Sequence, residues 1–329
     1  MTRSVLWAIS VVGIAGGAIA WATSREPVQT KPPAPYISKA SGVVFEDRNK
    51  NGVRDNGEPG LAGVRVSNMR DVVKTDRNGK WELGSTDDMI FYVVKPKGWM
   101  TPVDKDNVPR FYYIHKPAGS PKLKYESVKP TGPMPASIDF PLTRTKETDT
   151  FTALFFGDTQ PRDLREVDYL GADIIEPLIG KADEHAFGVT LGDIVFDDLS
   201  VTEPLVQKIG LIGIPWYYVL GNHDINYDVA DDRMSDEHWE RMFGPSYYSF
   251  DYGPTHFVVL DNVVWTGAEN TPDKKGFYRA GLGEEQLQWL KNDLETVPMN
   301  QLVVFMMHIP INEIEDKEEL FKLMMPRPY

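Results

Sequence analysis

Four short apolar runs after residue 150 of this 329-residue chain each stop abruptly at polar side chains. The clearest run is 216–220, Trp-Tyr-Tyr-Val-Leu, which stands between Pro215 and Gly221 and leads directly into Asn-His-Asp. A short apolar run between turn residues predicts a buried strand, with the polar residues in the loop at its carboxyl end. Because such loops carry the chemistry of α/β proteins, the pattern predicts a layered α/β domain with one functional edge over 149–329.

The polar residues that follow the four runs can each bind a metal ion or move a proton. They are Asp158, Gln160, Asp193, Asn222, His223, Asp224 and His308. Carboxylate, amide and imidazole groups together suit Zn, Mn or Fe better than Ca or Mg, because imidazole favours the borderline transition metals. A lone Asp at a strand end is more often a turn or cap residue, so the metal-site prediction depends on all four runs meeting at one edge.

The order of these residues resembles the calcineurin-like metallophosphoesterases. Four of the five blocks of that family, D-x-H, G-D, G-N-H-D/E and a lone His, are matched by Asp158-x-Gln160, Gly192-Asp193, Gly221-Asn222-His223-Asp224 and His308. The resemblance implies a two-sheet core flanked by helices, and a hydrolase that acts on phosphoric ester bonds. It also implies two divalent transition metals, Mn, Zn or Fe, and attack on the ester by a hydroxide that bridges them.

The family resemblance gives the expected metal ligands their roles. Asp193 is expected to bridge the two metals. Asp158 and Gln160 are expected to complete one side, and Asn222 and His308 the other side.

The remaining polar residues are expected to assist the reaction without binding metal. His223 is expected to protonate the leaving alkoxide or to stabilise the transition-state charge, as an imidazole that titrates near neutrality can do. Asp224 is expected to orient His223. Asp197 is expected to be a cap or turn residue that lies close enough to support the site.

The chain departs from the family pattern in two places. Gln160 replaces the histidine of D-x-H, and its amide oxygen can still ligate a divalent metal. The closing G-H-x-H block, which would supply one ligand to each metal, has no counterpart after His308. Two explanations stay open: a chain cut short before that block, or a site that lacks it and a domain that is C-terminally incomplete.

The first residues predict export from the cytoplasm. Residues 1–22 combine Arg3, an apolar run and a small-residue ending at Ala20-Trp21-Ala22, which is typical of a cleaved signal peptide. The same stretch also fits an uncleaved anchor, since about 17 apolar residues reach the lower limit for spanning a bilayer. Residues 23–37 are rich in proline and predict an extended linker. We therefore expect a periplasmic, membrane-anchored or extracellular protein, and the lack of cysteine excludes disulfides.

Residues 38–145 predict an all-β domain ahead of the α/β domain. Short apolar stretches alternate there with turns rich in Asp, Asn and Gly, which favours an immunoglobulin-like sandwich. The stretch 42–83, with Gly57-Glu-Pro-Gly-Leu-Ala-Gly-Val64 and Thr75-Asp-Arg-Asn-Gly-Lys-Trp81, resembles the B-type repeats of bacterial surface adhesins. That resemblance implies a spacer, or a module that contacts a partner or glycan at the cell envelope, rather than a catalytic part.

One loop of the all-β domain has the ligand spacing of a calcium site. Oxygen-bearing residues stand at loop positions 1, 3, 5, 9 and 12, with glycine at 6 and a backbone carbonyl at 7. The residues are Asp47, Asn49, Asn51, Gly52, Val53, Asp55 and Glu58. The alternative is an ordinary turn rich in Asp, Asn and Gly.

The charge of the chain limits its substrates. A formal net charge of −13 argues against sequence-independent binding to a nucleic-acid backbone, which needs clustered Lys and Arg. A phosphorylated small molecule or phosphoprotein would therefore have to be held by metal. We predict an exported metal-dependent phosphoesterase. The alternatives are a non-catalytic surface or binding protein with a degenerate phosphoesterase domain, and an inactive fragment of a longer enzyme.

Overall fold

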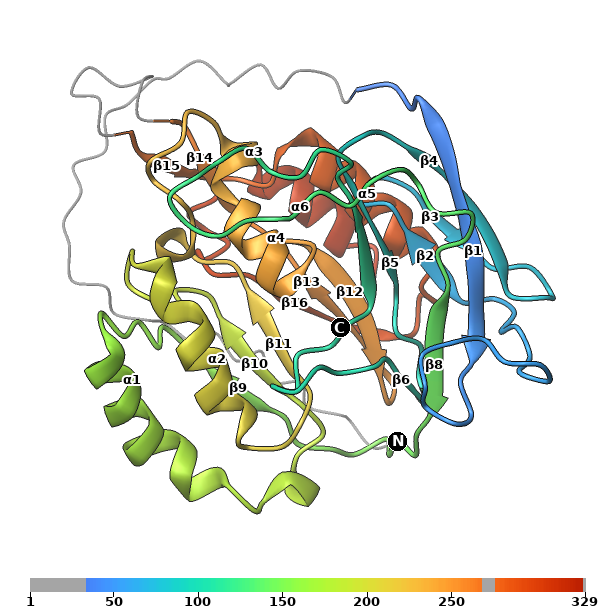
Figure 1. Cartoon of the computed structure of the whole chain (residues 1–329), viewed down its shortest axis with the longest axis horizontal. Helices are drawn as coiled ribbons and strands as arrows, with labels where there is room; N and C mark the ends of the chain where they lie inside the picture. Colours follow the sequence, from blue (N-terminus) through green and yellow to red (C-terminus); the bar gives the residue numbers. More distant parts are fainter. Residues whose placement is uncertain (1–33, 268–275, 328–329) are drawn as a thin grey trace.

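The computed structural model describes residues 34–267 and 276–327 (Figure 1). The expected signal peptide and the linker up to residue 33 lie outside the described residues. Within those ranges, no helix has the length and apolar character needed to span a bilayer. The described chain folds as a β-sandwich followed by a layered α/β domain, which confirms the predicted fold class.

The sandwich consists of two four-stranded sheets. The first has the order β4 (Lys80–Ser85), β1 (Ser38–Glu46), β8 (Phe140–Arg144), β6 (Trp99–Met100). The second has the order β3 (Val72–Lys74), β2 (Arg65–Ser67), β5 (Met89–Val93), β7 (Tyr112–His115). Buried and exposed residues alternate along β4, as expected for a strand with one face on the core. The Trp81 ring joins the sheets, because its centroid lies 5.8 Å from those of both Phe140 and Phe91.

The α/β domain contains two three-stranded sheets and a two-stranded hairpin. Their orders are β11 (Trp216–Val219), β10 (Gly188–Leu191), β9 (Leu154–Phe156); β12 (Tyr248–Tyr252), β13 (Thr255–Val259), β16 (Leu302–Met306); and β14 (Val263–Trp265), β15 (Tyr278–Ala280). The central strand β10 runs parallel to both neighbours, and β16 runs parallel to β13. Parallel strands bring their carboxyl ends to one edge of a sheet, so residues far apart in sequence meet there.

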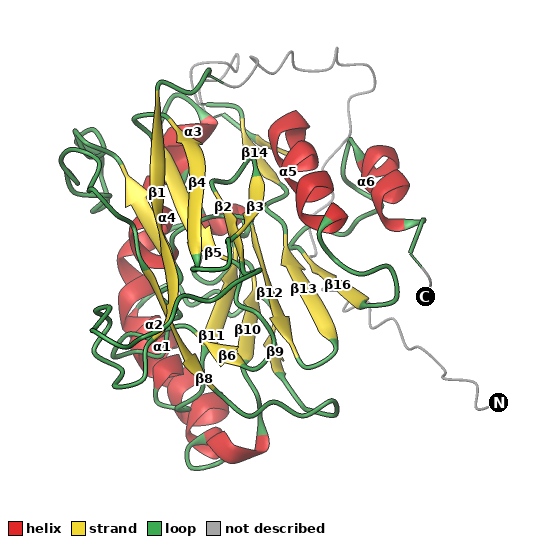
Figure 2. Ribbon diagram, turned by 90° about the vertical axis from the view of Figure 1, so that its right-hand side faces the viewer, coloured by secondary structure: helices red, strands yellow, loops and turns green. Residues whose placement is uncertain are grey.

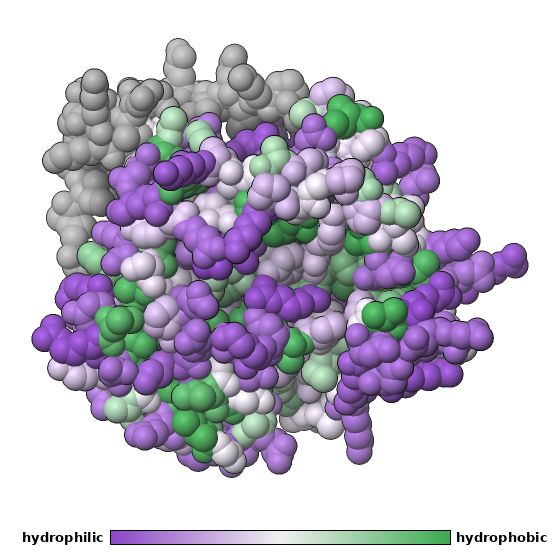
Figure 3. Space-filling model, in the orientation of Figure 1, coloured by the Kyte–Doolittle hydropathy of each residue, from purple (hydrophilic) through white to green (hydrophobic). Residues whose placement is uncertain are grey.

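Helices flank both sheets. They are α1 (Leu164–Leu170), α2 (Thr202–Gly210), α3 (Asp232–Ser235), α4 (Glu237–Phe243), α5 (Gly283–Glu295) and α6 (Lys317–Met324). Figure 2 shows α1 and α2 on one side of the strands and α5 and α6 on the other. Hydrophilic residues cover most of the face in Figure 3, and the apolar residues on it stand in small separate groups.

The sandwich packs directly against the α/β domain. The Lys95 carbonyl, just after β5, accepts a hydrogen bond of 2.8 Å from the backbone N–H of Asp251 in β12. The Lys95 ammonium lies 2.6 Å from a Glu147 carboxylate oxygen and 2.7 Å from the Asp251 carbonyl. These contacts join the segment after β5 to the edge strand β12 of the α/β domain, so the sandwich is not a module on a free linker.

Buried charges reinforce this interface. The guanidinium of Arg65, in the sandwich, lies 2.6 Å from the Asp251 carboxylate. His256 is fully buried between Asp251 and Asp293, with its ring nitrogens 2.8 and 2.7 Å from their oxygens. Burial alone would lower the pKa of His256, but the Asp293 charge and hydrogen bonds to both carboxylates raise it. Breaking such a buried network would leave a buried charge without a partner. The network therefore holds the sandwich and the α/β domain in one arrangement.

Candidate metal centre

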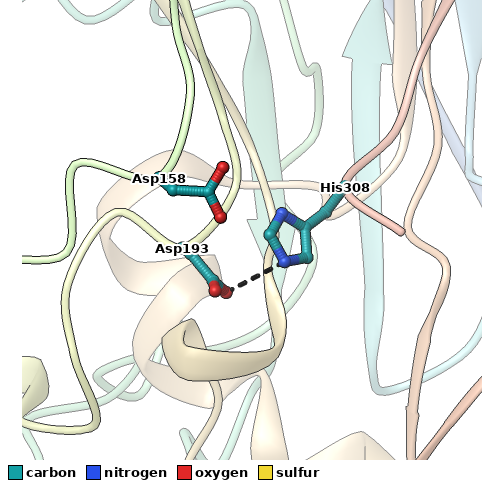
Figure 4. A group of neighbouring side chains, drawn as sticks. All are labelled: Asp158, Asp193 and His308. Atoms are coloured by element: carbon teal, nitrogen blue, oxygen red, sulfur yellow. Dashed lines mark ion pairs between the residues drawn. The ribbon is translucent and has the colours of Figure 1, made fainter. Parts of the chain in front are cut away.

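The four strands identified from the sequence end at one place. Asp158 follows β9, Asp193 follows β10, Asn222 follows β11, and His308 follows β16 of the neighbouring sheet. Figure 4 shows the side chains of Asp158, Asp193 and His308 pointing toward a common centre. The two sheets therefore meet at their carboxyl ends, and the predicted functional edge lies at this junction.

Asp158, Asp193 and His308 lie close enough to share an ion. One ligand atom from each lies within 4.8 Å of the others. The His308 Nε2 is 3.1 Å from Asp193 Oδ1, and its Nδ1 is 3.1 Å from the Leu191 carbonyl oxygen. Because a carbonyl can only accept, the Nδ1 carries a proton and the Nε2 faces the centre, which is the orientation that a metal-binding imidazole needs.

The two expected amide ligands lie beside this group. Asn222 places its Oδ1 3.2 Å from His308 Nε2. Gln160 donates from Nε2 to Asp193 Oδ2 at 2.5 Å. The structure thus brings all five predicted ligands together. For Gln160 to ligate a cation, its amide must instead present the oxygen, because an amide nitrogen has no free electron pair for a metal.

The backbone at the centre is held in unusual conformations. Asp158, Gln160 and Asp193 have φ angles of 43°, 38° and 48°, which lie in the left-handed region that non-glycine residues rarely occupy. Gly192 has a φ of 90°, and a Cβ there would lie 2.5 Å from His308 Nδ1. This close approach explains the glycine of the G-D block. Strained residues of this kind cluster at functional sites, where the surrounding structure enforces them.

The charges of the centre are coupled. Burial raises the pKa of Asp158, which the neighbouring His308 opposes. Burial would also raise the pKa of Asp193, but the hydrogen bond and charge of His308 hold it below its ordinary value. Burial disfavours the His308 cation, yet Asp193 outweighs it and raises the pKa of His308 to about 9. At neutral pH the centre therefore contains a protonated His308 paired with Asp193, and a cation would have to displace that proton.

His223 lies beside the centre. Its backbone N–H donates to Asp193 Oδ1 at 3.0 Å, and its Nε2 is 3.9 Å from Asp193 Oδ2. The imidazole stacks on Phe196, with centroids 4.4 Å apart. Its Nδ1 is 2.6 Å from Asp197 Oδ1. Asp197 therefore orients the ring and leaves Nε2 facing the centre.

The prediction that Asp224 orients His223 is wrong. Asp224 is buried, and its oxygens accept hydrogen bonds from the backbone N–H groups of Val195 at 3.1 Å and Gly221 at 2.9 Å. Burial raises its pKa to about 7. Asp224 fixes the loop rather than the imidazole. The partner is Asp197, and its position four residues after Asp193 in the same loop was the available sequence signal.

The donor set fits a divalent transition metal. Two carboxylates and an imidazole Nε2 converge on one point, with an amide oxygen next to them. In the part of the chain that the structure describes, this is the one group of three or more His, Cys, Asp or Glu residues that could share an ion. The amide of Asn222 lies beside His308 and the amide of Gln160 beside Asp193, so the two amides stand next to different members of this group.

Sequence comparisons assign the chain to a family. The profile of the calcineurin-like phosphoesterase family matches residues 151–324, and the profile of the N-terminal region of calcineurin-like phosphoesterases matches residues 48–128. The chain belongs to the calcineurin-like phosphoesterase family. The resemblance drawn from the four sequence blocks is thereby confirmed.

Three curated relatives show partial similarity. A probable glycerophosphodiester phosphodiesterase of Arcobacter nitrofigilis is 26% identical over 105 residues, covering 32% of this chain and 34% of the relative. A manganese-dependent ADP-ribose/CDP-alcohol diphosphatase of Arabidopsis thaliana is 26% identical over 165 residues, covering 38% of this chain and 53% of the relative. A serine-aspartate repeat-containing protein F of Staphylococcus epidermidis is 36% identical over 63 residues, covering 17% of this chain and 4% of the relative. The chain thus spans about half or less of these relatives, and its likeness to the serine-aspartate repeat-containing protein is confined to a short stretch.

The protonated His308 predicts a pH-dependent metal affinity. Because the pKa of His308 is about 9, the apparent affinity for Mn²⁺ should rise roughly tenfold per pH unit below that value and level off above it. Calorimetric titration in buffers of different ionisation enthalpy should show about one proton released per cation at neutral pH. His308→Asn should abolish this proton release. Affinity that is independent of pH in the unsubstituted protein would contradict the prediction.

Proposed function

We propose that the protein is an exported, metal-dependent phosphoesterase that hydrolyses phosphate esters. The observation that carries the proposal is the convergence of Asp158, Asp193 and His308 within 4.8 Å. The chain's membership of the calcineurin-like phosphoesterase family supports it. We retain two divalent transition metals, Mn, Zn or Fe, as the proposed cofactors, held by Asp158, Asp193 and His308 with Asn222 and Gln160.

The proposed reaction divides the work between cations and protein. Bound divalent cations would polarise the phosphoryl group and lower the pKa of a water molecule at the centre. His223 would donate the Nε2 proton to the oxygen of the leaving group, since Nε2 faces the centre while Nδ1 is held at 2.6 Å by Asp197. The Asp197 carboxylate would stabilise the imidazolium before that transfer, as a carboxylate does in other orienting pairs.

The proposed substrates are phosphorylated small molecules. Two of the partial relatives are named as acting on a glycerophosphodiester and on ADP-ribose or CDP-alcohols, which favours a phosphodiester or diphosphate over a phosphoprotein. With a formal net charge of −13, the protein would hold the phosphate through metal rather than through a basic surface.

The alternative is a protein with a degenerate phosphoesterase domain. The observation that favours it is that Gln160, in the place of the family's histidine, turns its amide nitrogen rather than its oxygen toward Asp193. A phosphoesterase domain with an incomplete ligand set would hold one cation or bind phosphate esters without turnover, in the manner of a surface or binding protein.

We also propose the predicted calcium site and the division of the chain into domains 38–145 and 149–329. Carboxylates organise the loop after β1. Asp47 accepts hydrogen bonds from the backbone N–H groups of Lys50 and Gly52, at 2.7 and 2.8 Å. Asn49 and Asn51 both donate to Asp55 Oδ2, at 2.7 and 2.8 Å. This geometry gathers oxygens in a short loop, which supports a calcium site at Asp47, Asn49, Asn51, Val53, Asp55 and Glu58.

Asp193→Asn tests the enzymatic proposal. Loss of the central carboxylate should lower the turnover of p-nitrophenyl phosphate or its bis ester, with Mn²⁺ or Zn²⁺, by at least about 100-fold, and should reduce metal content. Asp173→Asn, at an exposed position, is the matched control and should retain activity. If the native protein binds metal but turns over neither ester, the enzymatic proposal is wrong and the degenerate-domain alternative is favoured.

Calcium binding should stabilise the sandwich. Free Ca²⁺ at 100 times its Kd would stabilise the fold by about 2.7 kcal/mol and raise the thermal midpoint. Asp47→Asn should remove this effect, because Asp47 occupies the first position of the loop. Asp87→Asn, at an exposed position outside the loop, should keep it. If Ca²⁺ does not change the thermal midpoint of the native protein, the loop is an ordinary turn rich in Asp, Asn and Gly.

Export can be tested by fractionating cells that express the full chain. We expect the protein in the periplasm, in the envelope membrane or in the medium, with the size of a chain cut after Ala22 if the leader is cleaved. The matched control lacks residues 1–22 and should stay in the cytoplasm. Cytoplasmic retention of the full chain would refute export without bearing on the metal centre.

A further inference from the structure

A segment of the sandwich reaches the rim of the metal centre. The connection between β7 and β8, residues 116–139, leaves the sandwich and lies against α4 of the α/β domain. At its start the buried ammonium of Lys116 is 2.7 Å from both carboxylate oxygens of Glu237 and 2.9 Å from Glu240. Further along, the Glu126 carbonyl lies 2.8 Å from His238 Nδ1 and accepts a hydrogen bond of 3.2 Å from Arg241 Nε. The connection is therefore fastened to α4 on both sides of residues 117–125.

Tyr125, in this fastened connection, contacts the loop that carries Asp197. Its hydroxyl donates a hydrogen bond of 3.2 Å to the Asp197 carbonyl oxygen. The ring is supported by the His238 ring, whose centroid is 5.9 Å away, and by the Lys124 ammonium, 4.8 Å from the ring centroid. The Lys124 ammonium in turn lies 3.3 Å from Asp228, in the segment that follows the Gly-Asn-His-Asp loop.

Asp197 needs such support. It has a φ of 62°, a conformation that costs free energy for a residue with a Cβ. Its side chain is 47% exposed, so little packing holds it in place. Asp197 nevertheless has to present Oδ1 to the Nδ1 of His223 at 2.6 Å. Tyr125 fixes the backbone of this residue, and the residue fixes the imidazole.

We propose that Tyr125 is a positioning residue of the reaction, through which the N-terminal sandwich completes the active site. Tyr125 holds Asp197, and Asp197 holds the His223 ring with Nε2 toward the leaving group. The inference rests on the proposed phosphoesterase function, because only that function gives His223 a proton to deliver. It gives the sandwich a part in the chemistry in addition to any role as a spacer.

Tyr125→Phe removes the hydroxyl and keeps the ring, so it tests the contact alone. Loss of one hydrogen bond predicts a fall in kcat of about threefold to tenfold on an alkyl phosphate ester, whose alkoxide needs a proton to leave. The rate on p-nitrophenyl phosphate should change little, since p-nitrophenolate leaves without a proton. KM and metal content should stay constant. The matched control is Tyr169→Phe, at an exposed tyrosine of α1, which should behave as the native protein.

Two further measurements separate positioning from a general structural effect. In an Asp197→Asn background, Tyr125→Phe should cause no additional loss, because both substitutions break the same chain of contacts. The ring-nitrogen resonances of His223, observed by NMR in the isotope-labelled protein, should shift in Tyr125→Phe and not in Tyr169→Phe.

The possible outcomes are distinct. Equal rates for Tyr125→Phe and Tyr169→Phe on every ester, with an unchanged His223 resonance, would overturn the inference. Equal losses on p-nitrophenyl and alkyl esters would also overturn it, since they indicate general damage to the fold. A native protein without turnover, in which Tyr125→Phe still shifts the His223 resonance, would overturn the proposed function and support the contact.

Discussion

The contacts of the Asp193 carboxylate are the interactions on which the rest of the structure depends. Its Oδ1 lies 3.1 Å from His308 Nε2 and accepts the backbone N–H of His223 at 3.0 Å, while its Oδ2 accepts from Gln160. These partners come from the ends of three other strands and from both sheets. One buried side chain thus ties together the edge at which the sheets meet. The same convergence that closes the fold creates a negatively charged point, which the protonated His308 neutralises and which a divalent cation would fill.

The sandwich sets the geometry of this edge from outside. Arg65 pairs with Asp251 of the α/β domain, and Lys95 pairs with Glu147 in the link between the two domains. The fully buried His256 lies between Asp251 and Asp293. Buried charges of this kind tolerate few alternative arrangements, because each displacement would leave a charge without a partner. A fixed interface is what allows the connection of residues 116–139 to deliver Tyr125 to the loop of Asp197. A module on a free linker could not hold a hydroxyl within hydrogen-bonding distance of that loop.

The acidic residues around His223 illustrate how environment divides roles among identical groups. Asp224 is buried, accepts hydrogen bonds from backbone N–H groups and has a pKa raised to about 7, so it stabilises the loop. Asp197 is half exposed and contacts the imidazole of His223, so it orients that ring. Adjacency in sequence favoured Asp224, because it is the neighbour of His223. Adjacent side chains in a tight turn point in different directions, and the residue that meets the imidazole comes instead from the loop after the neighbouring strand.

The sequence by itself determined the fold class and which residues gather at the candidate metal centre. Apolar runs bounded by turn residues predict strands from local information, and parallel strands necessarily bring their carboxyl ends together. Asp158, Gln160, Asp193, Asn222 and His308 could therefore be named before any coordinates. Only the tertiary structure decided which acid holds His223 and that Tyr125 reaches Asp197. Tyr125 and Asp197 are 72 residues apart. Their contact depends on how the sandwich docks on α4, which is set by buried charge pairs between distant segments and leaves no periodic or local signal in the sequence.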